Sequence, residues 1–160
     1  MDKMRDKMPK RIVSVICALC LVAAVCAALT ACDDASSSPL PTDAEWVFYS
    51  LTVTENDTVT TYYASLGGKY DDMEVNEDMV TVDFTENRIV LTFINGDEIV
   101  GGWKKSGEAG GASLIEYDFV GESQTYYGTC GRTRAADGTE QCVLYVVCDN
   151  LTFYFTGSGM

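Results

Sequence analysis

The fold is decided by the stretch Met79-Val-Thr-Val-Asp-Phe84-Thr-Glu-Asn-Arg88-Ile-Val-Leu-Thr-Phe-Ile94. Branched and aromatic residues alternate with polar ones on both sides of Thr-Glu-Asn, the pattern of two strands that each bury one face. Only three residues separate these segments, so we expect a tight hairpin. Asn95 and Gly96 follow directly and favour a second hairpin, because both residues tolerate a positive φ. The stretch therefore predicts consecutive antiparallel strands.

The same pattern of short alternating segments separated by turns continues through most of the chain. Strands are predicted at residues 46–54, 79–84, 88–94, 98–103, 113–120, 123–130, 142–148 and 151–156. About eight strands with few crossovers predict an all-β antiparallel meander. We expect a small up-and-down barrel, which leaves no open edge, with a β-sandwich as the alternative. One helical turn is expected at residues 62–66, ended by Gly67 and Gly68, and a loop at residues 104–111. Trp46 and Trp103 are expected to fill the core.

Charge and composition exclude several classes of function. Asp and Glu number 24 against 11 Lys and Arg, which gives a net charge of −13, and the chain has no histidine. Nucleic acid is not expected as a partner, because phosphate contacts need Lys and Arg. The lack of histidine removes His-based acid–base catalysis, Ser-His and Cys-His nucleophiles and His-ligated zinc. We therefore expect no enzyme, no cofactor and no metal.

The first 31 residues predict an export signal. A basic stretch over residues 3–11 precedes 20 uncharged residues from Ile12 to Ala31. The sequence Leu29-Thr-Ala-Cys32 follows and resembles the lipobox of bacterial lipoproteins, in which a lipid is attached to the cysteine and the chain is cut just before it. The resemblance implies an acylated Cys32, membrane lipid as its partner and an extracytoplasmic location on the cell membrane. The alternative is an uncleaved helical anchor, since 20 apolar residues suffice to span a bilayer.

Residues 32–44 are expected to form a flexible tether after the acylated cysteine. They are polar, carry two of the three prolines and lack periodic apolar positions. The β-rich domain is therefore expected at residues 45–160.

A further resemblance concerns this domain. A Trp in the first strand, a short helical turn and hairpins with Val100-Gly-Gly-Trp103 at a strand end resemble short lipocalin-like domains of bacterial lipoproteins. The resemblance implies a barrel that binds a small or apolar ligand. The alternative is a structural or interaction module of the cell envelope with a filled core, which contacts a protein or a polysaccharide. A continuous cavity would favour the first function, and a filled interior the second.

Tyrosines are the candidate ligand-binding residues. Neighbouring rings, as in the pairs 62–63 and 126–127, must lie on opposite faces of a strand, so some rings point outward. They can line a pocket at the barrel mouth or form an exposed binding stripe, although aromatic residues are also ordinary in strands. The residues selected are Tyr62, Tyr126, Tyr127 and Tyr145.

Three cysteines remain in the expected domain: Cys130, Cys142 and Cys148. If the chain folds back around Ala136, Cys130 lies opposite Cys142, and an oxidising exterior favours a disulfide between them. A two-residue turn at residues 137–138 would instead place Cys130 opposite Tyr145 and leave free thiols.

The acidic segment at residues 71–78 offers many oxygen atoms but contains no glycine to make a sharp turn. We therefore expect a solvated loop there, with a weak calcium site as the alternative.

Overall fold

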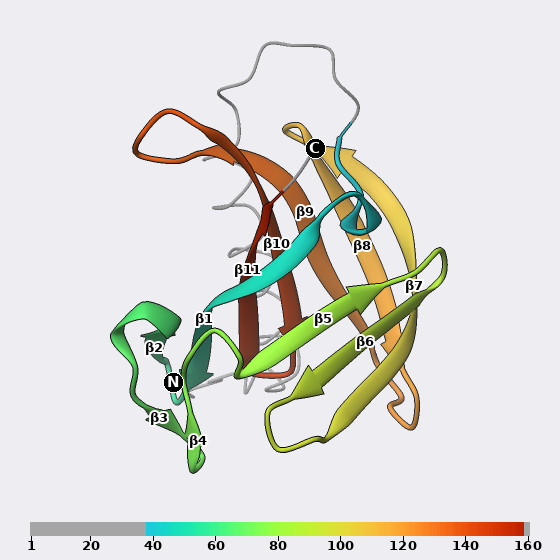
Figure 1. The fold of residues 1–160 in the computed structure, drawn as a ribbon. Coiled ribbons are helices and arrows are strands. Elements are labelled where there is room, and N and C mark those ends of the chain that lie inside the picture. Colours follow the sequence, from blue (N-terminus) through green and yellow to red (C-terminus); the bar gives the residue numbers. More distant parts are fainter. Residues whose placement is uncertain (1–37, 159–160) are drawn as a thin grey trace, which may run out of the picture.

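The computed structural model describes residues 38–158 (Figure 1). Its strands are β1 (Glu45–Glu55), β2 (Thr58–Tyr63), β3 (Lys69–Tyr70), β4 (Met73–Glu74), β5 (Val80–Phe84), β6 (Arg88–Phe93), β7 (Glu98–Ala109), β8 (Ala112–Phe119), β9 (Thr125–Arg134), β10 (Glu140–Cys148) and β11 (Leu151–Ser158). Two single 3₁₀ turns, η1 (Pro41–Asp43) and η2 (Ala64–Leu66), accompany them. Within residues 38–158, no helix is long and apolar enough to cross a membrane.

Nine strands form one antiparallel sheet in the order β2-β1-β11-β10-β9-β8-β7-β6-β5, and β3 pairs with β4. From β5 to β11 each strand pairs with its neighbour in sequence, whereas β1 pairs with the last strand, β11. The sheet curls until β1 approaches β5, which gives a barrel-like wall (Figure 1). The predicted all-β antiparallel meander is confirmed.

Short turns of the expected kind join the strands. Asn95 and Gly96 connect β6 to β7: Gly96 has φ 89°, and the Asn95 side chain accepts a hydrogen bond from the Asp97 amide at 3.0 Å. Gly67, at φ 69°, ends the η2 turn as predicted. At both positions the left-handed backbone is one that glycine adopts without the steric penalty of a Cβ.

Two segments differ from the prediction. The expected loop at 104–111 is wrong, because β7 continues to Ala109 and only Gly110 and Gly111 make the turn. The lysines there are exposed strand residues, and Lys104 pairs with Glu116 of β8 at 2.8 Å. The strand β2 was not expected, and a turn of two positive-φ residues, Asn56 and Asp57, folds it back onto β1.

The folded part also begins before the expected boundary at residue 45. Pro41, expected in the tether, is buried in η1. Its carbonyl oxygen accepts a hydrogen bond from the Trp46 indole nitrogen at 2.7 Å. This contact fixes the entry of the chain into β1.

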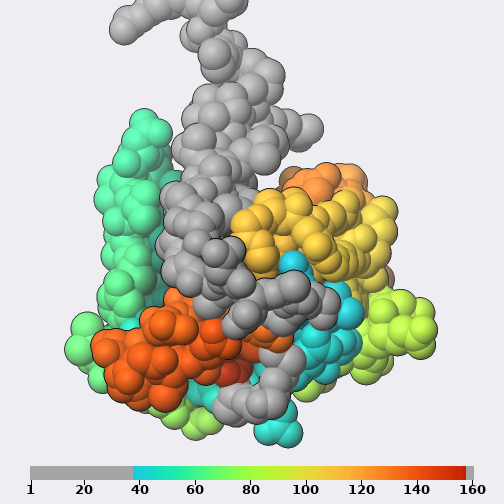
Figure 2. Space-filling view, turned by 90° about the horizontal axis from the view of Figure 1, so that it is seen from above, coloured from blue at the N-terminus to red at the C-terminus, as the bar shows by residue number. Residues whose placement is uncertain are grey.

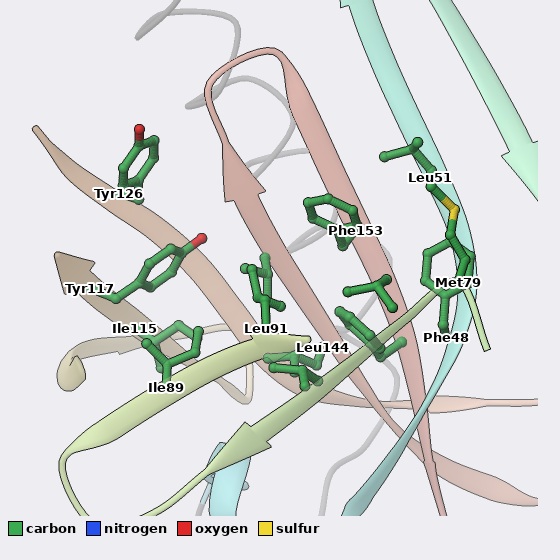
Figure 3. Packing of buried hydrophobic residues seen from close by; sticks show 14 of the residues in the cluster. Phe48, Leu51, Met79, Ile89, Leu91, Ile115, Tyr117, Tyr126, Leu144 and Phe153 are labelled. Atoms are coloured by element: carbon green, nitrogen blue, oxygen red, sulfur yellow. The ribbon is translucent and has the colours of Figure 1, made fainter. Parts of the chain in front are cut away.

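The interior of the curled sheet is filled by apolar side chains. Phe48, Leu51, Leu91, Leu144 and Phe153 come from β1, β6, β10 and β11, and each is at most 2% exposed. Figure 3 shows them converging on one another with further residues of the same cluster.

The two tryptophans lie at the periphery of this core, contrary to expectation. Both are only partly buried, and the Trp103 indole donates a hydrogen bond to the Thr85 carbonyl oxygen at 2.7 Å. Its ring meets Phe84 edge to face, with the ring centroids 5.4 Å apart. Since an indole N–H needs a hydrogen-bond partner, each tryptophan lies where a backbone carbonyl is within reach.

Candidate binding surface

The four tyrosines selected from the sequence lie on opposite faces of the sheet. Tyr126 is buried in the interior, where its ring packs against Tyr117 and Phe119. Tyr62 also faces inward, since it lies opposite buried Leu51, and its ring contacts Tyr70 at 5.8 Å between centroids.

The other two selected tyrosines face outward. Tyr127 is 55% exposed on β9, and Tyr145 on β10 packs against Tyr154. The structure therefore does not bring the four selected residues into one site.

A different group of tyrosines does come together, on the outer face. The register places Tyr63 of β2 opposite Ser50 of β1, Ser50 opposite Tyr154 of β11, and Tyr154 opposite Tyr145 of β10. Ring centroids are 5.9 Å apart for Tyr63–Tyr49, 5.1 Å for Tyr49–Tyr154 and 4.6 Å for Tyr154–Tyr145. We call Tyr63, Tyr49, Tyr154 and Tyr145 the outer tyrosine row.

A β-bulge places Tyr49 in this row. The pairing of β1 with β11 shifts between Phe48 and Ser50, so that one extra residue stands on β1. Phe48 and Leu51 both enter the core although they are three residues apart, which strict alternation would forbid. Bulges often re-aim a side chain, and this one turns the Tyr49 ring toward Tyr63 and Tyr154 on the outer face.

Neutral hydroxyl and aliphatic side chains flank the row on the same face. One neighbouring line across the strands consists of Thr61, Thr52 and Thr152, followed by Val147. The Thr52 and Thr61 hydroxyl groups lie 3.0 Å apart and share a hydrogen bond. The line on the other side consists of Val47, Thr156 and Val143, of which Val47 is exposed and Val143 is buried. Among the described residues, none of these outward positions carries an acidic or basic side chain.

The exposure of the row is greatest on β1 and β2. Tyr49 is 44% exposed and Tyr63 40%; Val47 beside Tyr49 and Val59, beyond the threonine line, are also exposed. Tyr145 and Tyr154 are half-buried, and burial raises the pKa of both phenols. The two therefore remain uncharged at physiological pH, so the row offers rings and neutral hydroxyl groups only.

The neutral face ends at β8 and β7. There the outward side chains form an ion pair between Glu116 and Lys104 at 2.8 Å, with Asp118 exposed nearby. Seen from above, the β1–β2 hairpin and the β7–β8 turn lie on opposite sides of the molecule (Figure 2).

The cysteines do not adopt the pairing expected from the sequence. Cys130 lies opposite Leu144, and Cys142 lies opposite Arg132, so the register is intermediate between the two alternatives considered. Diagonal neighbours of this kind are typically ~7–8 Å apart, at or beyond the usual reach of a disulfide. Cys130, Cys142 and Cys148 are free thiols, and burial raises the pKa of all three.

The acidic segment supplies the turn of the β3–β4 hairpin, at Asp71 and Asp72, and continues through β4. Its carboxylates are exposed, whereas Val75 within it is buried in the core. No group of three metal-ligating side chains occurs within residues 38–158. The expected signal peptide and the lipidation site Cys32 lie outside the described residues.

Comparisons with known proteins return no match to this chain among family models, curated proteins or solved structures.

The row itself could only partly be anticipated. The sequence predicts an exposed aromatic stripe as one of two arrangements, but it does not single out Tyr49, Tyr63 and Tyr154. The available signal was the three-residue spacing of Phe48 and Leu51, which marks the bulge.

Proposed function

We propose that this protein is a membrane-anchored, non-enzymatic interaction module of the bacterial cell envelope, and that it binds its partner through the outer tyrosine row. The row is the observation that carries the proposal, because it gathers four rings on a face without charged side chains in a protein of net charge −13. Exposed apolar and aromatic patches on a protein surface commonly mark interaction sites.

The filled interior supports binding on the outside rather than within. A ligand in the barrel would have to replace side chains such as Leu91 and Phe153, which are at most 1% exposed. Removing a side chain of this size from a close-packed core typically costs about 2–5 kcal/mol. Of the two functions that the sequence leaves open, the interaction module is therefore favoured over the lipocalin-like ligand carrier.

The binding proposal is tested with the full chain, expressed in a bacterium and purified in detergent. The protein is sedimented with lipid-extracted envelope material and the bound fraction is measured. We expect the double variant Tyr49→Thr/Tyr63→Thr to bind at least tenfold more weakly. Tyr127→Thr is the matched control, because it removes a ring outside the row that is at least as exposed as those of Tyr49 and Tyr63. Equal binding by all three folded proteins would refute the proposal.

The anchor is tested separately, because it depends on Cys32 alone. The lipobox-like sequence leads us to expect an acylated N-terminal cysteine by mass spectrometry of the membrane fraction. Cys32→Ala should remain unprocessed and lack the acyl mass. An unmodified wild-type chain in the cytosol would contradict the anchor and the location together.

A further inference from the structure

The chemistry of the face around the outer tyrosine row identifies the class of partner that fits it. The row and the two lines beside it contain rings, hydroxyl groups and aliphatic side chains, with no charge at the outward positions described above. An anionic polymer would find no cation there and would be repelled by the net charge of −13. A cationic partner would be drawn to the acidic remainder of the surface. The face therefore complements an uncharged partner.

The geometry of the row is linear. The four rings lie on four adjacent strands, β2, β1, β11 and β10, and the usual strand spacing makes the row roughly 15 Å long. Successive ring centroids are 4.6 to 5.9 Å apart. This interval is close to the length of one sugar unit in an extended polysaccharide. The ring planes change direction along the row: Tyr49 stands at 87° to Tyr63 and at 77° to Tyr154, whereas Tyr145 stacks on Tyr154 at 22°. A linear chain laid along the row would thus meet ring edges and ring faces in turn.

The threonine line supplies the polar part of such a site. Thr61, Thr52 and Thr152 run parallel to the row, two residues from it on β2 and β11 and three on the bulged β1, which is about 7 Å away. A sugar ring has apolar C–H faces and a rim of hydroxyl groups. Aromatic rings take up the faces, and hydroxyl side chains can both donate hydrogen bonds to the rim and accept them.

We infer that the outer tyrosine row binds a neutral, linear polysaccharide chain, an assignment that rests on the proposed function of this face. The apolar C–H faces of the sugars contact Tyr49 and Tyr63, which are the most exposed rings, and the hydroxyl rim meets Thr52 and Thr61. A protein partner is the competing occupant, since tyrosine is also enriched in protein interfaces. Neutrality, linearity and the parallel line of hydroxyl groups together favour the polysaccharide.

The test uses calorimetric titration of the detergent-purified full chain with two neutral probes, cellohexaose and the hexamer of N-acetylglucosamine. At least one hexamer should bind. In a series of oligomers of the same sugar, the affinity should rise from dimer to tetramer and then level off when the row is covered. Because no charges take part, raising the salt from 0.05 to 1 M should change the affinity less than about twofold. Polygalacturonate, an anionic polymer, should not bind.

Three variants distinguish the loss of ring contacts with the sugar from the loss of the folded structure. Tyr49→Thr/Tyr63→Thr should weaken binding more than tenfold, whereas Tyr49→Phe/Tyr63→Phe keeps both rings and should lose less than about threefold. Tyr127→Thr should bind as the wild type does. Circular dichroism checks that each variant is folded, and the Phe variant decides the outcome if the Thr variant does not fold.

The outcomes distinguish a failure of this inference from a failure of the proposed function on which it rests. If neither probe binds, but envelope material still sediments the wild type and not the Thr variant, the partner is not a neutral glycan and only the inference is overturned. If a probe binds equally well to all variants, the row is not its site and the inference is again overturned. If neither probes nor envelope material depend on the row, both fail.

Discussion

The substitution Tyr117→Phe removes one buried hydroxyl group that serves the backbone of two other strands. Tyr117 lies on β8, and its hydroxyl oxygen is 2.8 Å from the Val147 carbonyl oxygen and 3.0 Å from that of Tyr127. It also accepts a hydrogen bond from the Val147 amide at 2.5 Å. The pairing of β9 with β10 stops at Val146 and Gly128, so the tyrosine continues the hydrogen bonding of Val147 where the strands diverge.

In the Tyr117→Phe variant these backbone groups stay buried but lose the hydroxyl group as their hydrogen-bond partner. An unsatisfied buried donor or acceptor costs about 1–3 kcal/mol, so we expect the free energy of unfolding to fall by about 2–3 kcal/mol. For a domain of this size the melting temperature should fall by roughly 10 °C. The control is Tyr126→Phe, whose hydroxyl interacts with two exposed side chains, Asp149 at 3.3 Å and Gln124. It should cost less than about 1 kcal/mol.

The pH dependence gives a second check on the same residue. Burial raises the pKa of Tyr117 well above 10. The neutral phenol therefore stabilises the folded state fully below pH 10, and this contribution is lost as the pH rises toward the folded-state pKa. The stability difference between wild type and Tyr117→Phe should thus narrow above pH 10 in urea titrations. A loss below about 1 kcal/mol at pH 7, or a difference that widens at high pH, would refute the reasoning.

Three further predictions concern the packing. Gly101→Ala should cost about 2 kcal/mol in urea unfolding, because an added Cβ would lie 2.4 Å from the Asp118 carbonyl oxygen. Its neighbour Gly102→Ala, whose nearest atom would be 3.6 Å away, should cost less than about 0.5 kcal/mol. Equal effects would contradict this packing. Ser113→Ala should be neutral or stabilising, since the buried Ser113 hydroxyl has no hydrogen-bond partner within residues 38–158. A loss above about 1 kcal/mol would reveal a partner. Burial raises the pKa of Cys148 to about 12, so iodoacetamide at pH 8 should label it only after unfolding. Rapid labelling of the folded protein would contradict that burial.

The hairpins were predictable because their signals are local. The segments around residues 79–103 alternate in hydrophobicity, and Asn95 with Gly96 fixes the turn between β6 and β7. The extension of β7 was not predictable in this way, because Lys104 and Lys105 have little strand propensity of their own. Pairing with Glu116 and Ile115 of β8 keeps them in the strand.

The candidate surface depends on contacts between distant parts of the chain. Tyr49 and Tyr154 meet only because β1 pairs with β11, and no local pattern specifies that pairing. The cysteine register likewise depends on the turn between β9 and β10. It is centred near Asp137, whose carboxylate accepts a hydrogen bond from the Thr139 amide at 2.9 Å. A shift of one residue in such a turn changes every cross-strand pair.

The pairing of β1 with β11 affects the kinetics of folding. The hairpins from β5 to β11 can form in any order, each within microseconds, as soon as their own residues are free. The β1–β11 ladder instead joins segments about a hundred residues apart, so its formation carries the largest loop-closure entropy in the molecule. Folding should therefore end with this step, and until then the apolar side of β1 stays open to solvent and to wrong partners.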